Sequence, residues 1–290
     1  MPRTGPGPEQ AAVHVSEVPR AVGAATSIAT SLGLPVDDTS VLQNSNKLSL
    51  RLLPCDVVAR VAPVAHHVAE FEVALAQRLA EAGCPVAVLD PRAEPRVHER
   101  DGFVVTFWTH YESSAPGKLP PAEYADALHR LHAGMRLLDV PAPRFTDGAA
   151  RAAELLADHT LTPELPDRDR ELLAGTIHDL RSTLDERGGA GQLLHGEPHP
   201  GNLLDTEHGP LFIDLETCCL GPTEFDLAHA PEDIAALYPG VDHQLLHDCR
   251  LLVLAMIATW RWDRTDQLPN GHRLGQEWVA QLRARIGHFG

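Results

Sequence analysis

The sequence predicts an α+β protein with two lobes, a small N-terminal lobe rich in β-strands and a larger, mostly helical C-terminal lobe. The chain has 290 residues, which is enough for about two units of ordinary domain size. Apolar residues at every second position cluster in the first third of the chain, and helical spacing dominates the rest. We therefore divide the chain into a flexible tail (1–20), an N-terminal lobe (21–108) and a C-terminal lobe (109–290).

The elements predicted in the N-terminal lobe are strands and two helices. Strands are indicated by alternating apolar, β-branched and aromatic residues, and helices by apolar residues three or four positions apart. The helices are predicted at 21–34 and 66–82, and the strands at 47–53, 57–61, 86–89 and 103–108. The first two strands are separated by a short turn that contains Pro54, so they are expected to form a β-hairpin.

The C-terminal lobe is predicted to consist of helices with a short β insertion. Apolar residues recur with helical period in five segments, at 122–138, 147–157, 167–186, 241–262 and 275–286. The insertion has two short apolar runs, 203–204 and 211–215, with a turn between them. These runs flank the segment that carries the chemistry.

Composition and charge exclude several classes of function. With 43% apolar and 22% charged residues, the chain is typical of a globular protein. Its net charge of −16 makes nucleic acid an improbable partner; the charge favours cationic small molecules or simply keeps the protein soluble. The longest apolar run, near 251–258, is too short to span a membrane.

Cysteine use favours a cytoplasmic location. The chain has five cysteines, an odd number, and no C-x-x-C pair, which argues against a disulfide framework and against a cysteine zinc site. The N-terminus lacks the apolar core of a secretory signal. A reducing cytoplasm is therefore expected, and the oligomeric state is left open.

Three polar residues of one segment match the needs of phosphoryl transfer. Glu197 is followed five residues later by Asn202 and twelve residues after that by Asp214, each beside an apolar run. Transfer of a phosphoryl group needs a carboxylate to orient the attacking hydroxyl, and an Asn and an Asp to hold Mg²⁺ on the phosphates. Carboxylate and amide oxygens are the hard ligands that Mg²⁺ prefers.

The motifs around these residues resemble those of the aminoglycoside phosphotransferase family, the small-molecule branch of the protein-kinase-like fold. That family's signature is H-G-D-x-H-x-x-N, then I-D-[FW]-E, then G-P-x-x-[WF]-D-L-A. The corresponding segments here are 195–202, 213–216 and 221–228, and the resemblance covers roughly 40–262. It implies a bilobal kinase fold, ATP or GTP as phosphoryl donor, Mg²⁺, and a small hydroxylated molecule as acceptor.

The resemblance also assigns roles in the catalytic segment. Glu197 stands where the family has Asp; its extra methylene moves the oxygens by roughly 1 Å, a displacement that can cost ~100-fold in rate. The loop is therefore either reshaped around Glu or weakened. His199 is the second catalytic candidate, unless it only packs in the loop. His195, Glu216 and Asp226 are candidates for substrate contact or support, with Asp226 as a brace behind the loop.

The nucleotide-binding parts of the N-terminal lobe are atypical. Neither a P-loop nor a glycine-rich kinase loop is present, and in its place the small polar residues Asn44, Ser45 and Asn46 could approach phosphates. Arg60 replaces the lysine expected on the third strand. Its expected partner is Glu72, with Glu70 as the competing choice.

The connection after the last strand of this lobe is expected to be the hinge that pairs with the nucleotide base. Its backbone from Trp108 to His110 would make the pairing, while the indole of Trp108 is expected to pack rather than to stack on the base.

Two functions remain open at this point. The first is a kinase with a small hydroxylated acceptor, such as a cationic antibiotic, which would confer antibiotic resistance. A sugar, choline or an amino alcohol is an alternative acceptor, because fold does not determine substrate. The second is a pseudokinase that binds nucleotide without transfer.

Overall fold

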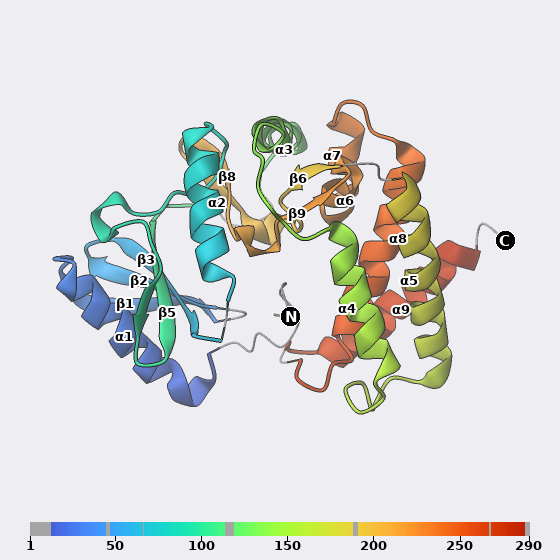
Figure 1. The fold of residues 1–290 in the computed structure, drawn as a ribbon, viewed down its shortest axis with the longest axis horizontal. Coiled ribbons are helices and arrows are strands. Elements are labelled where there is room, and N and C mark those ends of the chain that lie inside the picture. Colours follow the sequence, from blue (N-terminus) through green and yellow to red (C-terminus); the bar gives the residue numbers. More distant parts are fainter. Residues whose placement is uncertain are drawn as a thin grey trace. The chain divides into compact units, whose positions relative to one another are not determined.

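The computed structural model describes residues 13–44, 47–65, 67–113, 119–187, 191–266 and 268–287. The chain forms two compact units, whose elements are labelled in Figure 1. The N-terminal unit consists of Gln10–Leu138 and Gly201–Glu216, and the C-terminal unit includes Asp139–Pro200 and Thr217–Gly290. The first contains a five-stranded sheet and the second is mainly helical, as the sequence predicts.

The sheet of the N-terminal unit is antiparallel, with strand order β1-β2-β3-β5-β4. Its strands are β1 (Val36–Asn44), β2 (Leu48–Pro54), β3 (Val57–Pro63), β4 (His98–Arg100) and β5 (Phe103–Thr109). β2 and β3 form the predicted hairpin, in which Ser49 pairs with Arg60. This register decides which side chains of the two strands are neighbours.

The two faces of this hairpin have different partners. The leucines at alternate positions of β2 are fully buried in one apolar core with α1 (Val18–Ser31). Residues between them point to the opposite face, because side chains alternate along a strand. On that face Ala62 of β3 packs against Ala69, the first residue of α2 (Ala69–Glu81). Arg60, two positions before Ala62, therefore faces α2.

A second hairpin in the N-terminal unit positions two candidate metal ligands. It consists of β7 (Leu203–Thr206) and β8 (Gly209–Phe212). Just beyond the paired strands, the backbone N–H of Ile213 donates to the carbonyl of Asn202 over 3.0 Å. Asn202 and Asp214 therefore lie at the same end of the hairpin.

The predicted strand at 86–89 is not a regular strand. Val86 forms an isolated parallel bridge with Phe212, whereas Leu89 forms an antiparallel bridge with Trp108. The segment changes partner within four residues, so no continuous ladder forms. The apolar pattern of this segment therefore reflects its burial, and its backbone bridges link it to both β8 and β5.

The C-terminal unit is a bundle around the long apolar helix α8 (His243–Trp260). Its other helices are α4 (Phe145–Ala157), α5 (Asp167–Arg187), α6 (Thr223–His229), α7 (Glu232–Leu237) and α9 (Gly271–Gly287). The short strands β6 (Gln192–Leu194) and β9 (Cys219–Gly221) pair with each other, and β6 ends just before His195. Among the helices described in both units, none is long and apolar enough to cross a bilayer.

Several boundaries differ from the prediction. α1 begins at Val18 rather than at residue 21, and Val13 is buried in the core of the sheet. The described end of the expected tail is therefore ordered by apolar packing. The N-terminal unit also extends beyond residue 108, because α3 (Pro121–Met135) lies within it. Finally, the polar edge strand β1 was not predicted, since most of its side chains are exposed and carry no apolar alternation.

Candidate active site

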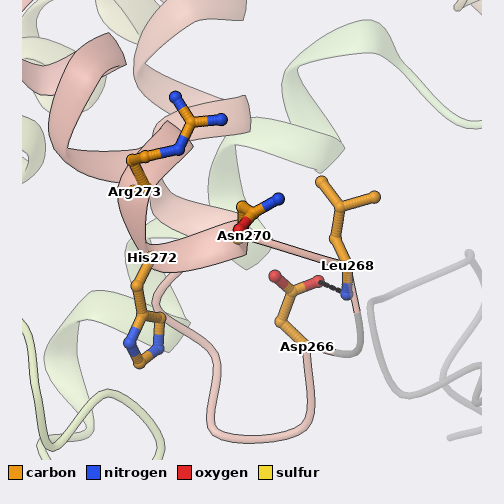
Figure 2. A pocket seen from close by; sticks show the side chains of 6 residues that line it. Asp266, Leu268, Asn270, His272 and Arg273 are labelled. Carbon is orange, nitrogen blue, oxygen red and sulfur yellow. Dashed lines mark hydrogen bonds between the residues drawn. The ribbon is translucent and has the colours of Figure 1, made fainter.

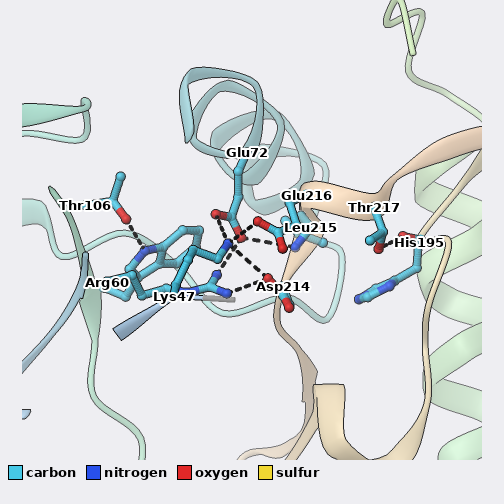
Figure 3. Close-up of polar contacts among 10 residues, drawn as sticks. Lys47, Arg60, Glu72, Thr106, His195, Asp214, Leu215, Glu216 and Thr217 are labelled. Carbon is cyan, nitrogen blue, oxygen red and sulfur yellow. Dashed lines mark hydrogen bonds and ion pairs between the residues drawn. The ribbon is translucent and has the colours of Figure 1, made fainter. Parts of the chain in front are cut away.

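Five charged side chains of the N-terminal unit meet in one cluster, shown in Figure 3. Its cations are Lys47, next to the start of β2, and Arg60 on β3. Its acids are Glu72 on α2, and Asp214 and Glu216, which follow β8. We call these five residues the charge cluster. A buried charge costs free energy unless it is paired with an opposite charge. In this cluster two cations pair with three carboxylates.

Glu72 is the centre of the charge cluster. Only 2% of its side chain is exposed, and it pairs with Arg60 at 2.5 Å and with Lys47 at 2.9 Å. It also accepts the backbone N–H of Leu215 at 3.2 Å, which ties α2 to the segment after β8. Burial alone would raise the pKa of Glu72, but the charges of Arg60 and Lys47 outweigh it and lower the pKa. The expected partner of Arg60 is thus its partner in the structure, rather than Glu70.

Arg60 is clamped from three sides. One guanidinium nitrogen donates to Glu72 and another to Asp214 Oδ1, each at 2.5 Å. Its central carbon lies 5.6 Å from the centre of the Trp108 ring, within the range of a cation–π contact. These three contacts fix the plane of the guanidinium group.

Asp214 is the most accessible acid of the charge cluster. Its side chain is 23% exposed, against 2–3% for Glu72 and Glu216. Lys47 and Arg60 both contact its Oδ1, and Figure 3 shows the other carboxylate oxygen directed away from the two cations. Although burial opposes ionisation, the charges of Arg60 and Lys47 lower the pKa of Asp214. Asp214 is therefore an ionised carboxylate with one oxygen directed outward.

The charge cluster offers a hard divalent cation its most accessible acid, Asp214. Oxygen atoms of Glu72, Asp214 and Glu216 lie within 4.8 Å of one another, but Lys47 Nζ lies within 3.1 Å of all three acids. Asn202, at the same end of the second hairpin as Asp214, is 9% exposed and adds an amide oxygen donor. Carboxylate and amide oxygens suit Mg²⁺. Asp214 also has a φ of 68°, in the left-handed region that non-glycine residues rarely adopt, and such strain is common at functional sites.

In the C-terminal unit, Asp226 holds the start of the segment 195–202, which is predicted to be catalytic. Its carboxylate accepts the backbone N–H of His195 at 2.9 Å and that of Gly196 at 2.8 Å. Thr217 adds a bond from its hydroxyl to the carbonyl of His195 over 3.1 Å, drawn in Figure 3. His195 and Asp226 are both fully buried. Asp226 therefore braces the loop from behind.

The loop after this brace carries both catalytic candidates. Glu197 and His199 are half-buried, and the N–H of His199 donates to the carbonyl of Glu197 over 2.8 Å. The ring of His195 accepts the N–H of Glu197 at 3.3 Å, so His195 acts on the backbone of the loop.

The residues of the expected hinge, 108–110, make several contacts within the N-terminal unit. The Trp108 indole donates to Thr106 at 2.9 Å and is buried, so it packs in the unit. The N–H of Thr109 donates to Val88 at 3.0 Å. The ring of His110 lies 3.3 Å from Asp56. Three groups of the expected hinge thus already have partners within the unit: the Trp108 indole, the Thr109 N–H and the His110 ring.

The three residues predicted to approach the phosphates, 44–46, can be compared with the structure only at Asn44. Asn44 is the last residue of β1, and its amide donates to the carbonyl of Val13 at 3.0 Å. Ser45 and Asn46 lie outside the described residues. The next residue, Lys47, was absent from the predicted site, although it contacts all three acids of the charge cluster. The hairpin register could have revealed it, because Lys47 shares a face with Arg60.

A surface pocket of about 280 Å³ in the C-terminal unit has no residue in common with the predicted site (Figure 2). Most of its lining side chains are exposed. They come from the loop before α9 and from its first turn: Asp266, Leu268, Asn270, Gly271, His272 and Arg273. We assign this pocket no role in the chemistry.

Comparison with known proteins gives one family. A family model described as "Phosphotransferase enzyme family" matches residues 44–250, a range that contains the charge cluster and the loop braced by Asp226. No curated protein sequence matches the chain.

Solved structures with the same fold include three kinases. An amicoumacin kinase in complex with AMP-PNP, Ca²⁺ and Ami is 10% identical with a TM-score of 0.71, over 93% of this chain and 96% of that chain. The GDP and kanamycin complex of APH(2″)-IIIa is 14% identical with a TM-score of 0.66, over 91% and 98%. The choline kinase LicA from Streptococcus pneumoniae is 14% identical with a TM-score of 0.68, over 91% and 97%. These likenesses confirm the predicted kinase-like fold.

Proposed function

Because the chain belongs to the phosphotransferase enzyme family APH, we propose that it transfers the γ-phosphate of ATP or GTP to a hydroxyl of a small molecule. The observation that carries this proposal is the charge cluster, where two cations lie beside an ionised Asp214 with one outward oxygen. Phosphoryl transfer requires cations for the phosphates and an acid for the metal side by side. The N-terminal unit would bind the nucleotide and the C-terminal unit the acceptor.

Asp214 and Asn202 are the residues that would hold Mg²⁺. Both offer oxygen donors at one end of the second hairpin, and Mg²⁺ is commonly bound by one or two such ligands together with phosphates and water. When bound, the metal neutralises charge on the phosphate oxygens. Glu72 and Glu216 are paired with Lys47 deeper in the unit, so they hold the cation in place rather than the metal.

Glu197 takes the role of the carboxylate that orients the acceptor. The acceptor hydroxyl donates its hydrogen bond to Glu197, and its oxygen forms a bond to the γ-phosphorus. The bond from this phosphorus to the bridging oxygen breaks, the nucleoside diphosphate leaves, and the proton passes to the Glu197 carboxylate. The brace from Asp226 supports this role, because it fixes the backbone two residues before Glu197.

The acceptor class we propose is a hydroxylated organic cation. The net charge of −16 attracts positive molecules and raises their local concentration. One solved structure of the same fold is a complex with kanamycin, and another is a choline kinase. Kanamycin and choline are both cations at neutral pH. An antibiotic, and with it a resistance function, is one member of this class; a choline-like amino alcohol is another. All five cysteines are buried and none forms a disulfide, which fits a reducing cytoplasm.

The direct test measures nucleotide consumption and phosphorylated product with ATP and with GTP, in Mg²⁺, against cationic antibiotics, amino alcohols and neutral sugars. Transfer to a cationic acceptor supports the proposal. Tight nucleotide binding without transfer to any acceptor would instead identify a pseudokinase. Transfer to neutral sugars alone would remove the cationic acceptor class and keep the kinase.

Asp214→Asn is expected to abolish transfer while the fold is retained. Asparagine tolerates the left-handed backbone at this position, so the change removes the charge without new strain. We expect a loss of more than ~100-fold in kcat with an unchanged circular dichroism spectrum. A variant that keeps most of its activity would remove Asp214 as a metal ligand.

Glu197→Asp tests how the catalytic loop is built. Shortening the side chain retracts the carboxylate by roughly 1 Å, and such a displacement can change the rate by ~100-fold. We expect kcat to fall, because the braced loop is adapted to Glu, while the Kd for nucleotide is unchanged. A gain in kcat would show that Glu197 is a compromised version of the Asp design.

A further inference from the structure

Lys47 lies where three carboxylates converge. Its Nζ is 2.6 Å from Glu216 Oε2, 2.9 Å from Glu72 Oε2 and 3.1 Å from Asp214 Oδ1. Only 7% of its side chain is exposed. An ammonium group has three donors, and each of them has a carboxylate within reach.

The register of the β2–β3 hairpin explains this position. Ser49 pairs with Arg60, and Lys47 lies two residues before Ser49, on the same face of the sheet. The leucine between Lys47 and Ser49 points into the opposite core with α1. Lys47 and Arg60 therefore enter the charge cluster side by side, from neighbouring strands.

The two cations differ in their freedom to engage a further anion. Arg60 is held between Glu72 and Asp214 and lies over the Trp108 ring, so its planar fork is already committed. Lys47 has a compact charge on a flexible stem, and its donors rotate. One of its donors can therefore turn toward a phosphate while the others stay on the acids.

We propose that Lys47, rather than Arg60, donates hydrogen bonds to the nucleotide phosphates, and that Arg60 is a positioning residue for Glu72 and Asp214. This inference rests on the proposed kinase function. A phosphate oxygen takes the place of Asp214 Oδ1, the most distant of the three acids, at the ammonium group. Glu72 and Glu216 keep the ammonium in position. The cation expected on the third strand is thereby supplied from the second.

Chemical labelling tests this assignment in the unaltered protein, because the chain has only two lysines, Lys47 and Lys118. The probe is 5′-(fluorosulfonylbenzoyl)adenosine, which places a lysine-reactive sulfonyl fluoride where the phosphates bind; its guanosine counterpart is used if the protein binds GTP. We expect mass spectrometry to find the modification on Lys47 and Mg²⁺–nucleotide to suppress it. Modification confined to Lys118, or modification of Lys47 that nucleotide does not suppress, would overturn the assignment.

Substitutions provide the second test, with nucleotide affinity measured by calorimetry. Lys47→Met removes one charge-assisted contact to phosphate and is expected to weaken binding about 10- to 100-fold. Arg51→Met is the matched control: Arg51 also lies on β2 and pairs with two acids, but outside the charge cluster. The double variant K47M/R60K returns a lysine to the third strand and should recover part of the lost affinity, whereas a merely structural role of Lys47 predicts no recovery.

The outcomes separate this inference from the proposed function. A wild-type protein that binds neither ATP nor GTP removes the proposed function itself. A wild-type protein that binds nucleotide, together with a folded Lys47→Met variant that binds equally well, removes only the role of Lys47. Lys47→Met could fail to fold because three acids lose their partner, and in that case Lys47→Arg is used, which keeps the charge. A weaker nucleotide affinity in Lys47→Arg supports phosphate binding by Lys47. An unchanged nucleotide affinity overturns it.

Discussion

The brace behind the catalytic loop gives a prediction whose size follows from the structure. Asp226 is fully buried and accepts the backbone N–H groups of His195 and Gly196, at 2.9 and 2.8 Å. Asp226→Ala leaves both groups without these acceptors, and a buried donor without a partner costs about 1–3 kcal/mol. We therefore expect a loss of roughly 2–6 kcal/mol, a large part of the roughly 5–15 kcal/mol that stabilises an ordinary domain.

Asp226→Asn is the milder version of the same perturbation. Its amide keeps one acceptor oxygen and presents an NH₂ group to the second backbone donor, so we expect about half of the loss, roughly 1–3 kcal/mol. The loop that carries Glu197 should then be mobile in a protein that still folds. Because Asp226 acts through the backbone of the loop, kcat is expected to fall while the Kd for nucleotide is unchanged.

Two measurements check this reasoning. Urea unfolding gives the loss of stability, and amide hydrogen exchange, followed by mass spectrometry of the peptide that contains His195 and Gly196, reports the two bonds directly. Asp233→Asn, an exposed acid on α7, is the control and should leave both unchanged. Exchange in Asp226→Ala that is as slow as in the wild type would refute the brace, as would an unchanged kcat.

Two further predictions concern the same unit and one glycine outside it. Gly196 has a φ of 90°, and an added Cβ would lie 2.0 Å from the Thr217 carbonyl oxygen, whereas Gly209 has a φ of 102° and no described atom within 4 Å of such a Cβ. Thermal unfolding should therefore show a loss of about 1–3 kcal/mol in Gly209→Ala and a larger loss in Gly196→Ala. Equal losses would contradict the steric argument. Burial lowers the pKa of His229 to about 4, with help from His199 and His195 and against the charge of Asp226. The unfolded chain therefore binds a proton first as pH falls below about 6.5. The unfolding free energy should drop by up to about 3 kcal/mol between pH 6.5 and 4. A His229→Phe variant should flatten this part of the pH profile, and an identical profile would exclude His229 as its source.

The spacing of apolar residues was sufficient to predict an element where that element is long and has one buried face. The hairpin of β2 and β3 and the helix α5 are found within one or two residues of their predicted ends, because alternating and helical spacing each leave a distinct pattern of apolar residues. The edge strand β1 leaves no such pattern. It is held by a backbone ladder to β2 while most of its side chains are exposed, and a ladder does not depend on side-chain identity.

Short elements depend on neighbours that are remote in sequence. β6 and β9 have three residues each and pair across a separation of more than twenty residues. The segment 86–89 divides its backbone bonds between β8 and β5. No local pattern encodes such pairings, so the sequence predicts that these residues are buried but not what they pair with.

The candidate site was predictable to the extent that motif spacing reflects chemistry. Asp214 and Asn202 were identified from their spacing, and Arg60 with Glu72 from the expected positions on a strand and a helix. Lys47 was given no role because it was taken as the first residue of the strand predicted at 47–53, outside the family's motifs. Its role follows only from the register that places it on the same face as Arg60.

The division of the chain into units gives the proposed roles a testable separation. Residues 201–216 belong to the same unit as the sheet, although more than sixty residues separate them from Leu138 in the chain. The cations, the metal candidates and Glu72 thus form one folded unit, while Glu197 and Asp226 belong to the other. Changes in the charge cluster should therefore alter nucleotide affinity first, whereas changes in the braced loop should alter kcat at constant nucleotide affinity. A Glu197 variant that loses nucleotide affinity as strongly as a Lys47 variant would contradict this separation.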